Sequence, residues 1–284
     1  MTPVRIESMD VLTRPAPQPD HHIAYGNDAS QFGELWLPEA HGSALLPLVV
    51  FFHGGWWQSS IDLRYAGHLG VAFKRDGIAC WSLEYRRVGE TGGGWPTTFQ
   101  DAAHGFDFAA ELAKKYPIDT KRVIVMGHSA GGHLAFWIAG RHHIDPHSEI
   151  YQPRPQVPLR GAISLAGAVD LRKAIELAVG PVFAHDREEV YSLMGGGPEK
   201  YPDRYKAGDP GELLPFNIPQ ILLQGTEDDQ IPPGLPAYWA ERAKKVGDTV
   251  TVSILRGVDH LDVSDPASSA WPAVLQATRQ LLKS

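Results

Sequence analysis

The most specific chemical motif in the sequence is the pentapeptide Gly-His-Ser-Ala-Gly at 127–131. It lies between an apolar run at 123–126, which we expect to be a strand, and an apolar segment at 130–140, which we expect to be a helix. A serine on such a sharp strand-to-helix turn needs glycine neighbours, because larger side chains would collide with adjacent chain. The helix N-terminus also stabilises negative charge that develops beside the serine. The motif predicts that Ser129 is a nucleophile for acyl transfer.

A second motif, His-Gly-Gly-Trp at 53–56, directly follows the apolar run at 48–52. Acyl transfer passes through a tetrahedral oxyanion, which backbone N–H groups from an early loop and from the residue after the nucleophile can stabilise. We expect these donors to be the amides of Gly55, Trp56 and Ala130. His53 is expected to be a structural residue that hydrogen-bonds to the loop. Taken separately, the motifs have simpler explanations, a tight turn and an N-cap serine, but their order along the chain favours the catalytic interpretation.

A serine hydroxyl is a weak nucleophile, so it needs a base, and the base needs a carboxylate that fixes its tautomer. Two loops that follow apolar runs supply candidates. After the run at 221–223 come three adjacent acids, Glu227, Asp228 and Asp229. After the run at 250–255 comes His260. Neighbouring side chains in an extended segment point in opposite directions, so only one of two adjacent acids can face the histidine.

The elements that must position these groups alternate along the chain. Short apolar runs lie at 48–53, 78–85, 122–127, 161–167, 220–225 and 249–255, with helix-like segments between them. This alternation predicts an α/β fold, with a mostly parallel sheet and helices on both of its faces. Residues 33–38 are expected to form an earlier, antiparallel strand at the edge. Residues 101–116 are expected to form a helix that Asp101 caps, and 130–140 a helix packed inside the fold.

One stretch departs from this alternation. Residues 171–179 and 187–193 have helical character, and residues 195–219 are rich in glycine and proline. We interpret 168–219 as a small lid-like insertion over the C-terminal edge of the sheet, where such folds place their ligands. Residues 142–158 are expected to be a long surface loop.

Composition limits the class of protein. The 284 residues are 43% hydrophobic and 21% charged, which fits a single α/β domain over 1–284 with an N-terminal arm at 1–20. With 26 lysines and arginines against 33 acidic residues, the formal charge of −7 argues against nucleic acid as a partner. The single cysteine, Cys80, cannot form an internal disulfide. The sequence lacks a signal-peptide pattern and a membrane-length apolar run, so we expect a soluble cytoplasmic protein.

Other side chains with possible chemistry have less specific patterns. Trp57 and Trp95 are candidate substrate-binding residues, although core packing is the usual role of tryptophan. His142, His143 and His147 are close in sequence, yet no cysteine or Glu-x-x-His pattern joins them. We therefore expect no metal site.

At this point the residues resemble the α/β-hydrolase-fold esterases of the hormone-sensitive-lipase, kynurenine-formamidase and bacterial feruloyl-esterase-like groups. The similarity runs from about Tyr25 to the C-terminus. It rests on His-Gly-Gly-Trp-Trp at 53–57, Glu-Tyr-Arg at 84–86, Trp-Pro at 95–96 with Asp101 after it, the serine motif extended by Gly132, and Asp228 and His260. The resemblance implies an eight-stranded, mostly parallel sheet, a Ser-Asp-His triad and no cofactor. It also selects Asp228, because Gly-x-x-Asp-x-x-Ile-Pro at 225–232 places this residue where the family's acid falls; Asp229 is the main rival and Glu227 the weaker one.

Three functions are consistent with these motifs. The favoured one is a carboxylesterase that cleaves short acyl or aryl esters of small molecules through an acyl-enzyme. The second is an arylformamidase, since His-Gly-Gly followed by two aromatic residues is closer to the formamidase-like members. The third is a catalytically inactive binding module, which would require a disrupted triad; all three triad positions are occupied by suitable residues.

Overall fold

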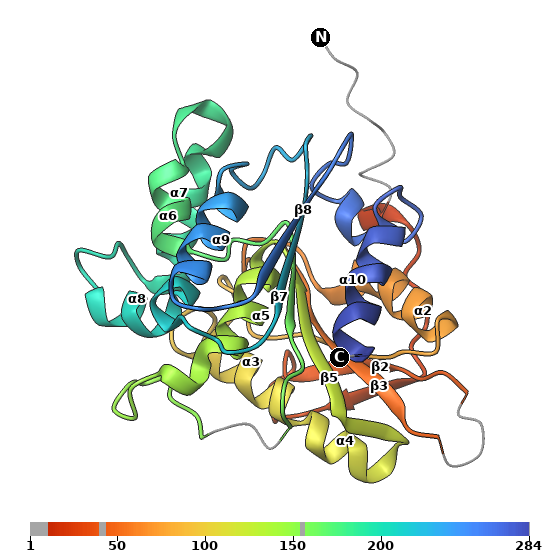
Figure 1. Cartoon of the computed structure of the whole chain (residues 1–284). Helices are drawn as coiled ribbons and strands as arrows, with labels where there is room; N and C mark the ends of the chain where they lie inside the picture. Colours follow the sequence, from red (N-terminus) through yellow and green to blue (C-terminus); the bar gives the residue numbers. More distant parts are fainter. Residues whose placement is uncertain (1–10, 40–43, 154–156, 284) are drawn as a thin grey trace.

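The computed structural model describes residues 11–39, 44–153 and 157–283. Its centre is an eight-stranded sheet in the order β1-β2-β4-β3-β5-β6-β7-β8 (Figure 1). The strands are β1 His21–Ala24, β2 Phe32–Trp36, β3 Leu46–Phe52, β4 Ala79–Leu83, β5 Ile118–His128, β6 Ala162–Leu165, β7 Gln220–Gly225 and β8 Val250–Leu255. Strand β2 is antiparallel to β1 and β4, and all other pairs are parallel. Each of the six predicted apolar runs overlaps one strand, which confirms the α/β class.

The strand predicted at 33–38 exists as β2 and is antiparallel, but it is not at the edge. The edge strand is β1, which pairs with β2 from His21 to Ala24. Three of the four β1 residues are exposed, so this strand lacks the apolar pattern by which a buried strand is predicted.

Helices cover both faces of the sheet, as Figure 1 shows. On one face lie α3 Thr97–Asp107, α4 Ala109–Lys115, α5 Ala130–Gly140 and α9 Leu235–Lys245. On the other lie α2 Gly67–Arg75 and α10 Trp271–Lys283. Strand β3 contributes to both cores, because alternate side chains of a strand point to opposite faces. Val50 and Phe52 pack in the first core, and Val49 and Phe51 in the second.

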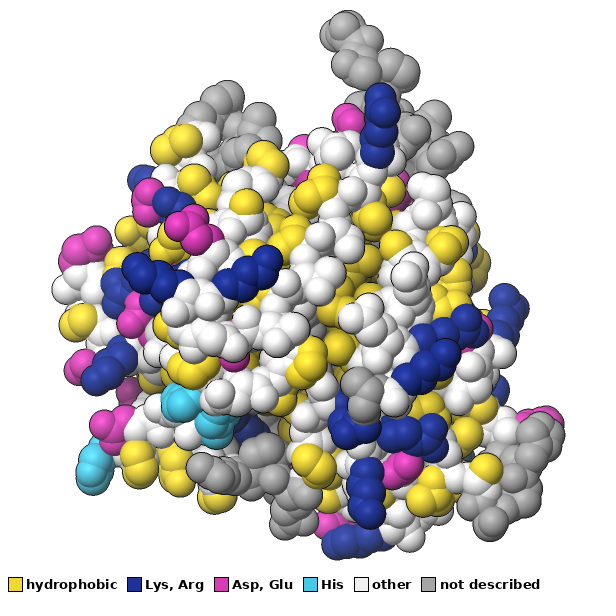
Figure 2. All heavy atoms as spheres, viewed as in Figure 1, with side chains coloured by type: hydrophobic (Ala, Val, Ile, Leu, Met, Phe, Trp, Pro, Cys, Tyr) yellow, Lys and Arg dark blue, Asp and Glu magenta, His cyan; other side chains and the backbone are white. Residues whose placement is uncertain are grey.

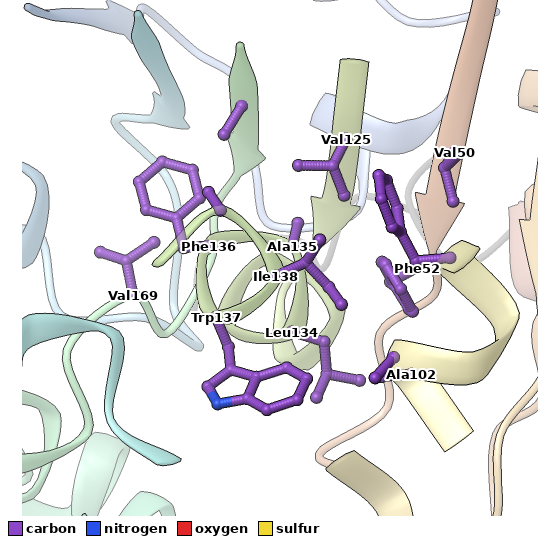
Figure 3. Packing of buried hydrophobic residues seen from close by; sticks show 14 of the residues in the cluster. Val50, Phe52, Ala102, Val125, Leu134, Ala135, Phe136, Trp137, Ile138 and Val169 are labelled. Carbon is purple, nitrogen blue, oxygen red and sulfur yellow. The ribbon is translucent and has the colours of Figure 1, made fainter. Parts of the chain in front are cut away.

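Helix α5 is buried along its entire length. Figure 3 shows its side chains pointing outward on several sides, toward Phe52, Ala102 and Val169 among others. A helix that is apolar all round must be enclosed by other elements. The prediction for 130–140 is therefore confirmed. The packing on all sides fixes α5, and with it the turn at Ser129 that precedes the helix.

Asp101 does not cap a helix, contrary to the sequence prediction. Helix α3 begins four residues earlier, at Thr97, and the helical segment is divided at Phe108 into α3 and α4. The Asp101 carboxylate is fully buried and accepts hydrogen bonds from Arg86 and from the side chain of Gln31. The ion pair with Arg86, 2.7 Å long, comes from a distant segment and explains why a carboxylate occurs inside this helix.

The stretch at 168–219 contains more helix than its sequence pattern indicates. It forms α6 Leu171–Leu177, α7 Gly180–Met194, α8 Pro202–Gly208 and the 3-10 turn η3 Pro210–Leu213. On the left of Figure 2, acidic and basic side chains lie side by side over this region; the ion pairs Lys173–Glu176 and Arg172–Glu212 belong to it. That these residues act as a lid remains a prediction.

The predicted arm at 1–20 is described only from residue 11 onward. Within that part Val11 is buried and Arg14 pairs with Asp265 at 2.7 Å. The predicted loop at 142–158 begins with the 3-10 turn η2 Arg141–His143, and Ile150 is buried within it; residues 154–156 lie outside the described ranges. Among the described residues, no helix combines the length and the apolar composition that crossing a bilayer requires.

Cys80, the only cysteine in the sequence, lies on β4 and is fully buried. Burial raises the pKa of its thiol to about 12, because a thiolate would lose its hydration inside the sheet.

Candidate active site

Ser129 occupies a strained turn between β5 and α5. Its φ of 55° and ψ of −120° lie in a region that side chains rarely adopt. The flanking glycines are required by close approach of backbone: a Cβ at Gly127 would lie 1.9 Å from the carbonyl oxygen of Gly131, and a Cβ at Gly131 would lie 2.0 Å from that of Phe52. The local sequence therefore dictates this turn.

His260 lies in the loop after β8, and its Nδ1 is 3.0 Å from Oδ1 of Asp228 in the loop after β7. The same carboxylate oxygen accepts hydrogen bonds from the backbone N–H groups of Gln230 and Ile231. Burial by itself raises the pKa of Asp228, but His260 and the two amides outweigh it, so the pKa lies below its usual value. The carboxylate stays ionised and holds a proton on His260 Nδ1, which leaves Nε2 with a lone pair.

The two rival acids lie elsewhere. Asp229 and Glu227 are exposed. Asp229 accepts a hydrogen bond from the side chain of Gln230, and Glu227 accepts one from Thr226. Of the three adjacent acids, the structure brings only Asp228 to His260.

The His260 ring lies beside the serine turn, with its centroid 4.8 Å from that of His128. Within the described residues, neither Ser129 Oγ nor His260 Nε2 forms a hydrogen bond with a protein atom. A nucleophile and its base are often separated in this way in a free enzyme and approach each other in the substrate complex.

The loop at 53–57 packs directly against the serine. A Cβ at Gly54 would lie 2.9 Å from Ser129 Cβ, and three consecutive residues, Gly55, Trp56 and Trp57, have positive φ. Within the described ranges, the backbone N–H groups of Gly55, Trp56 and Ala130 have no acceptor. Unpaired amides next to a nucleophile can bind an anionic oxygen.

Hydrogen bonds on the far side of the loop orient these amides. His53 Nδ1 lies 2.7 Å from the carbonyl oxygen of Gly54, and its Nε2 lies 2.9 Å from Glu84. Since C=O and N–H point in opposite directions across a planar trans peptide, a contact to Gly54 O directs the N–H of Gly55 the other way. The structural role expected for His53 fits these contacts.

Glu84 is a supporting residue that sequence reasoning noted only as part of a family motif. It is buried, and burial raises its pKa, but His53 and Arg87 outweigh this effect and bring the pKa below its usual value. Tyr65 was missed altogether: its hydroxyl accepts the N–H of Gly54 at 2.6 Å. The contact of Glu84 with His53 spans 31 residues and that of Tyr65 with Gly54 spans 11, so neither contact follows from the spacing within one helix or strand.

The tryptophans differ in position. Trp57 is completely buried and lies edge-on to His133, while Trp95 donates its indole N–H to Glu149 and lies edge-on to Phe99. Trp56 is only partly buried and faces His185 of α7, with ring centroids 5.1 Å apart. Trp95 also contacts the 168–219 region, because its backbone N–H donates to Leu193 and the guanidinium of Arg204 lies over its ring. The described residues contain no group of three or more side chains arranged to hold a metal ion.

A sheet in this order, with a serine turn after β5 and an Asp-His pair after β7 and β8, is the α/β-hydrolase fold. Residues 34–237 match the BD-FAE family model, and because they make up more than half of the 284 residues, the chain belongs to the BD-FAE family.

Individual proteins are similar at lower identity. The probable isoprenylcysteine alpha-carbonyl methylesterase ICMEL1 of Arabidopsis thaliana is 26% identical over 255 residues, covering 87% of this chain and 52% of that protein. Esterase LipC of Mycobacterium tuberculosis is 24% identical, covering 79% and 55%. The chain thus spans about half the length of these relatives. The crystal structure of esterase B from Lactobacillus rhamnosis has a TM-score of 0.79 at 17% identity, covering 98% of this chain and 91% of that one, so it shows the same fold.

Proposed function

We propose that this chain is a serine hydrolase that cleaves carboxylic esters through an acyl-enzyme intermediate. The observation that carries the proposal is the buried Asp228–His260 hydrogen bond beside a strained serine turn with three unpaired amides. Membership of the BD-FAE family supports it, as do relatives named as a methylesterase and an esterase.

The proposed reaction has two halves, acylation of Ser129 and hydrolysis of the acyl-enzyme, and the same groups act in both. Ser129 Oγ attacks the ester carbon while its proton passes to His260 Nε2, and Asp228 stabilises the imidazolium that forms. The oxyanion accepts hydrogen bonds from the amides of Gly55, Trp56 and Ala130. The alcohol leaves with the proton from His260, and water, activated by the same nitrogen, then releases the acid. None of these steps calls for a cofactor.

We further propose that the acyl group is short. Trp56 stands next to the amide donors and contacts His185 of α7, and Gln58 donates to Glu189 of the same helix. These contacts close the region over the oxyanion loop. Trp57 lies edge-on to Trp56 with ring centroids 6.4 Å apart, and Trp95 lies below Arg204 of α8. We propose that these side chains border the acyl pocket and that residues 168–219 act as its lid.

A substrate panel tests the function and the acyl length together. Purified protein is assayed on p-nitrophenyl esters of two to twelve acyl carbons, a range chosen to exceed what an ordinary pocket holds, and on methyl ferulate and N-formylkynurenine. We expect the highest kcat/KM on acetyl to butyryl esters. Higher kcat/KM on esters of ten or more carbons would contradict the short pocket. Hydrolysis of N-formylkynurenine in preference to every ester would show that the protein is an arylformamidase and not an esterase.

We also propose a cytoplasmic protein, on the basis of its composition and its single buried cysteine. Fractionation of the source cells, with an antibody against the chain, checks this; recovery in the medium would contradict it.

A further inference from the structure

A chain of three buried hydrogen bonds connects the oxyanion loop to the loop that carries His260. The N–H of Gly54 lies 2.6 Å from the Tyr65 hydroxyl, and that hydroxyl lies 2.8 Å from Nδ1 of His128. His128 Nε2 in turn lies 2.8 Å from the backbone carbonyl oxygen of His260. Tyr65 and His128 are both buried.

The donor and acceptor in each bond are determined by the groups at the two ends. A carbonyl oxygen can only accept, so His128 Nε2 carries a proton and donates it to His260. A neutral imidazole then has a lone pair on Nδ1, which accepts the Tyr65 O–H. The Tyr65 oxygen accepts the N–H of Gly54. Burial and the nearby His260 lower the pKa of His128 to about 3, so the ring stays neutral and this arrangement holds throughout the pH range of an esterase assay.

The three hydrogen bonds join the oxyanion loop and the His260 loop through backbone atoms at both ends. Asp228 holds the His260 side chain by its ring, while His128 holds the same residue by its main-chain carbonyl. At the other end, Tyr65 holds the residue before the first amide donor of the oxyanion loop. His128 itself is the residue before Ser129, so base, nucleophile and oxyanion loop share one set of bonds.

From this geometry we infer that His128 and Tyr65 are positioning residues, which set the distance between the general base and the oxyanion donors without touching the substrate. His128 occupies the variable position of the serine motif, and Tyr65 lies in the 3-10 turn η1 Leu63–Ala66, which the sequence does not mark. The inference rests on the proposed function, because it assigns roles relative to Ser129 and His260.

Two substitutions of His128 separate the two bonds of its ring. In His128→Gln the amide nitrogen reaches the place of Nε2 and can still donate to the His260 carbonyl, but the acceptor for Tyr65 is lost. In His128→Asn the amide reaches only the place of Nδ1, so the Tyr65 contact can persist and the His260 contact is lost. Tyr65→Phe breaks the chain on the same side as His128→Gln.

We expect His128→Asn to lower kcat on p-nitrophenyl acetate by about 10- to 100-fold with KM within about threefold, the loss expected of misplaced groups. His128→Gln and Tyr65→Phe should each lower kcat by only about 3- to 10-fold. The double variant should have a kcat no lower than that of the less active single variant, because both substitutions break the hydrogen bond between Tyr65 and His128. Thr278→Val is the control: it removes a buried hydroxyl that donates to the Val274 carbonyl within α10, outside this chain of bonds, and should leave kcat unchanged. Melting temperatures are measured for all variants.

A purely structural role would lower the melting temperatures while kcat stayed within twofold of the wild-type value, and this would overturn the inference. So would equal or higher kcat in His128→Asn than in His128→Gln. Should one variant fail to fold, the remaining single variants still give the comparison with wild type.

The rate at which a fluorophosphonate labels Ser129 distinguishes failure of the inference from failure of the proposed function. Labelling requires the base and the oxyanion donors but no particular acyl pocket. An unlabelled wild-type protein would reject the proposed function. Labelling of the wild type and of His128→Asn at the same rate would reject the positioning role alone.

Discussion

Two helices of this protein begin in opposite ways. Helix α6 starts at Asp170, whose carboxylate accepts the N–H of Lys173, and Asp209 accepts the N–H groups of Leu171 and Arg172. The first three amides of α6 are therefore all paired with buried carboxyl groups. Helix α5 starts at Ser129, which makes no side-chain cap. The amide of Ala130 is unpaired within the described residues, as are those of Gly55 and Trp56 beside it.

The two helix starts differ in whether their first backbone amides already have hydrogen-bond acceptors. Every helix leaves its first N–H groups without intrahelical partners, and an anion there is stabilised by the helix dipole. At α6 the protein supplies its own hydrogen-bond acceptors, Asp170 and Asp209, which fix the start of this helix. At α5 the amide is unpaired within the described residues, and we propose that the oxyanion formed during the reaction binds there.

Removing the nucleophile should have the largest effect. Ser129→Ala leaves the unpaired amides in place, so kcat should fall by several orders of magnitude and leave about the 10³–10⁴-fold acceleration over water that binding and oxyanion contacts sustain. Single-turnover assays on p-nitrophenyl acetate measure this residual activity. Near wild-type kcat in this variant would show that another residue is the nucleophile.

The choice among the adjacent acids gives the next largest effect. Asp228→Asn should leave His260 in the wrong tautomer and lower kcat on the order of 10⁴-fold with little change in melting temperature. Asp229→Asn, at an exposed position beside it, is the matched control and should behave like an ordinary surface substitution. A larger loss of kcat in Asp229→Asn would mean that the orienting carboxylate is misassigned.

At the start of α6 the expected effect is on stability. Asp209→Ala leaves three N–H groups, the buried ones of Leu171 and Gly211 and the half-buried one of Arg172, without their acceptor, so the free energy of unfolding should fall by about 2–4 kcal/mol. Denaturant unfolding measures this, with exposed Asp203→Ala on α8 as the control. The kcat of Asp209→Ala on p-nitrophenyl acetate should change by less than about tenfold, because the α5 donors are untouched. Equal stability of the two variants would remove the distinction between the helix starts.

The last effect concerns pH. Burial and the neighbouring Asp170 raise the pKa of Asp209 from 3.8 to about 8. The folded state therefore binds this proton more tightly than the unfolded state, and the stability it contributes is present below pH 4 and lost as the pH rises toward 8. Asp209→Asn removes this titration, so its melting temperature relative to wild type should increase between pH 5 and pH 8. Parallel pH profiles of the two proteins would contradict the shift.

The parts of the molecule that could be predicted from sequence are those that local residues determine. The turn around Ser129 needs glycine at 127 and 131 because backbone carbonyls occupy the space of their Cβ atoms. The apolar pattern extends over all of α5 but only over the C-terminal half of β5. For that reason the turn and α5 were predicted at their observed positions, whereas β5 begins at Ile118, before the expected run at 122–127.

What escaped prediction depends on partners distant in the chain. Asp101 looked like a helix cap, but Arg86 and Gln31 place it inside the fold. The contact of Tyr65 with His128 spans 63 residues, and that of Asp209 with Leu171 of α6 spans 38. Such hydrogen bonds exist only after the sheet has brought the segments together, so single-sequence patterns cannot reveal them.

The burial of Cys80 has a practical consequence for following motion. With its thiol inside the sheet and its pKa raised to about 12, this side chain should not react with maleimides in the folded protein. A cysteine introduced at exposed Glu188 on α7 would then be the sole reactive thiol of the native chain. A fluorophore attached there would test the proposed lid, because opening and closing of residues 168–219 would change its emission in an otherwise unaltered background.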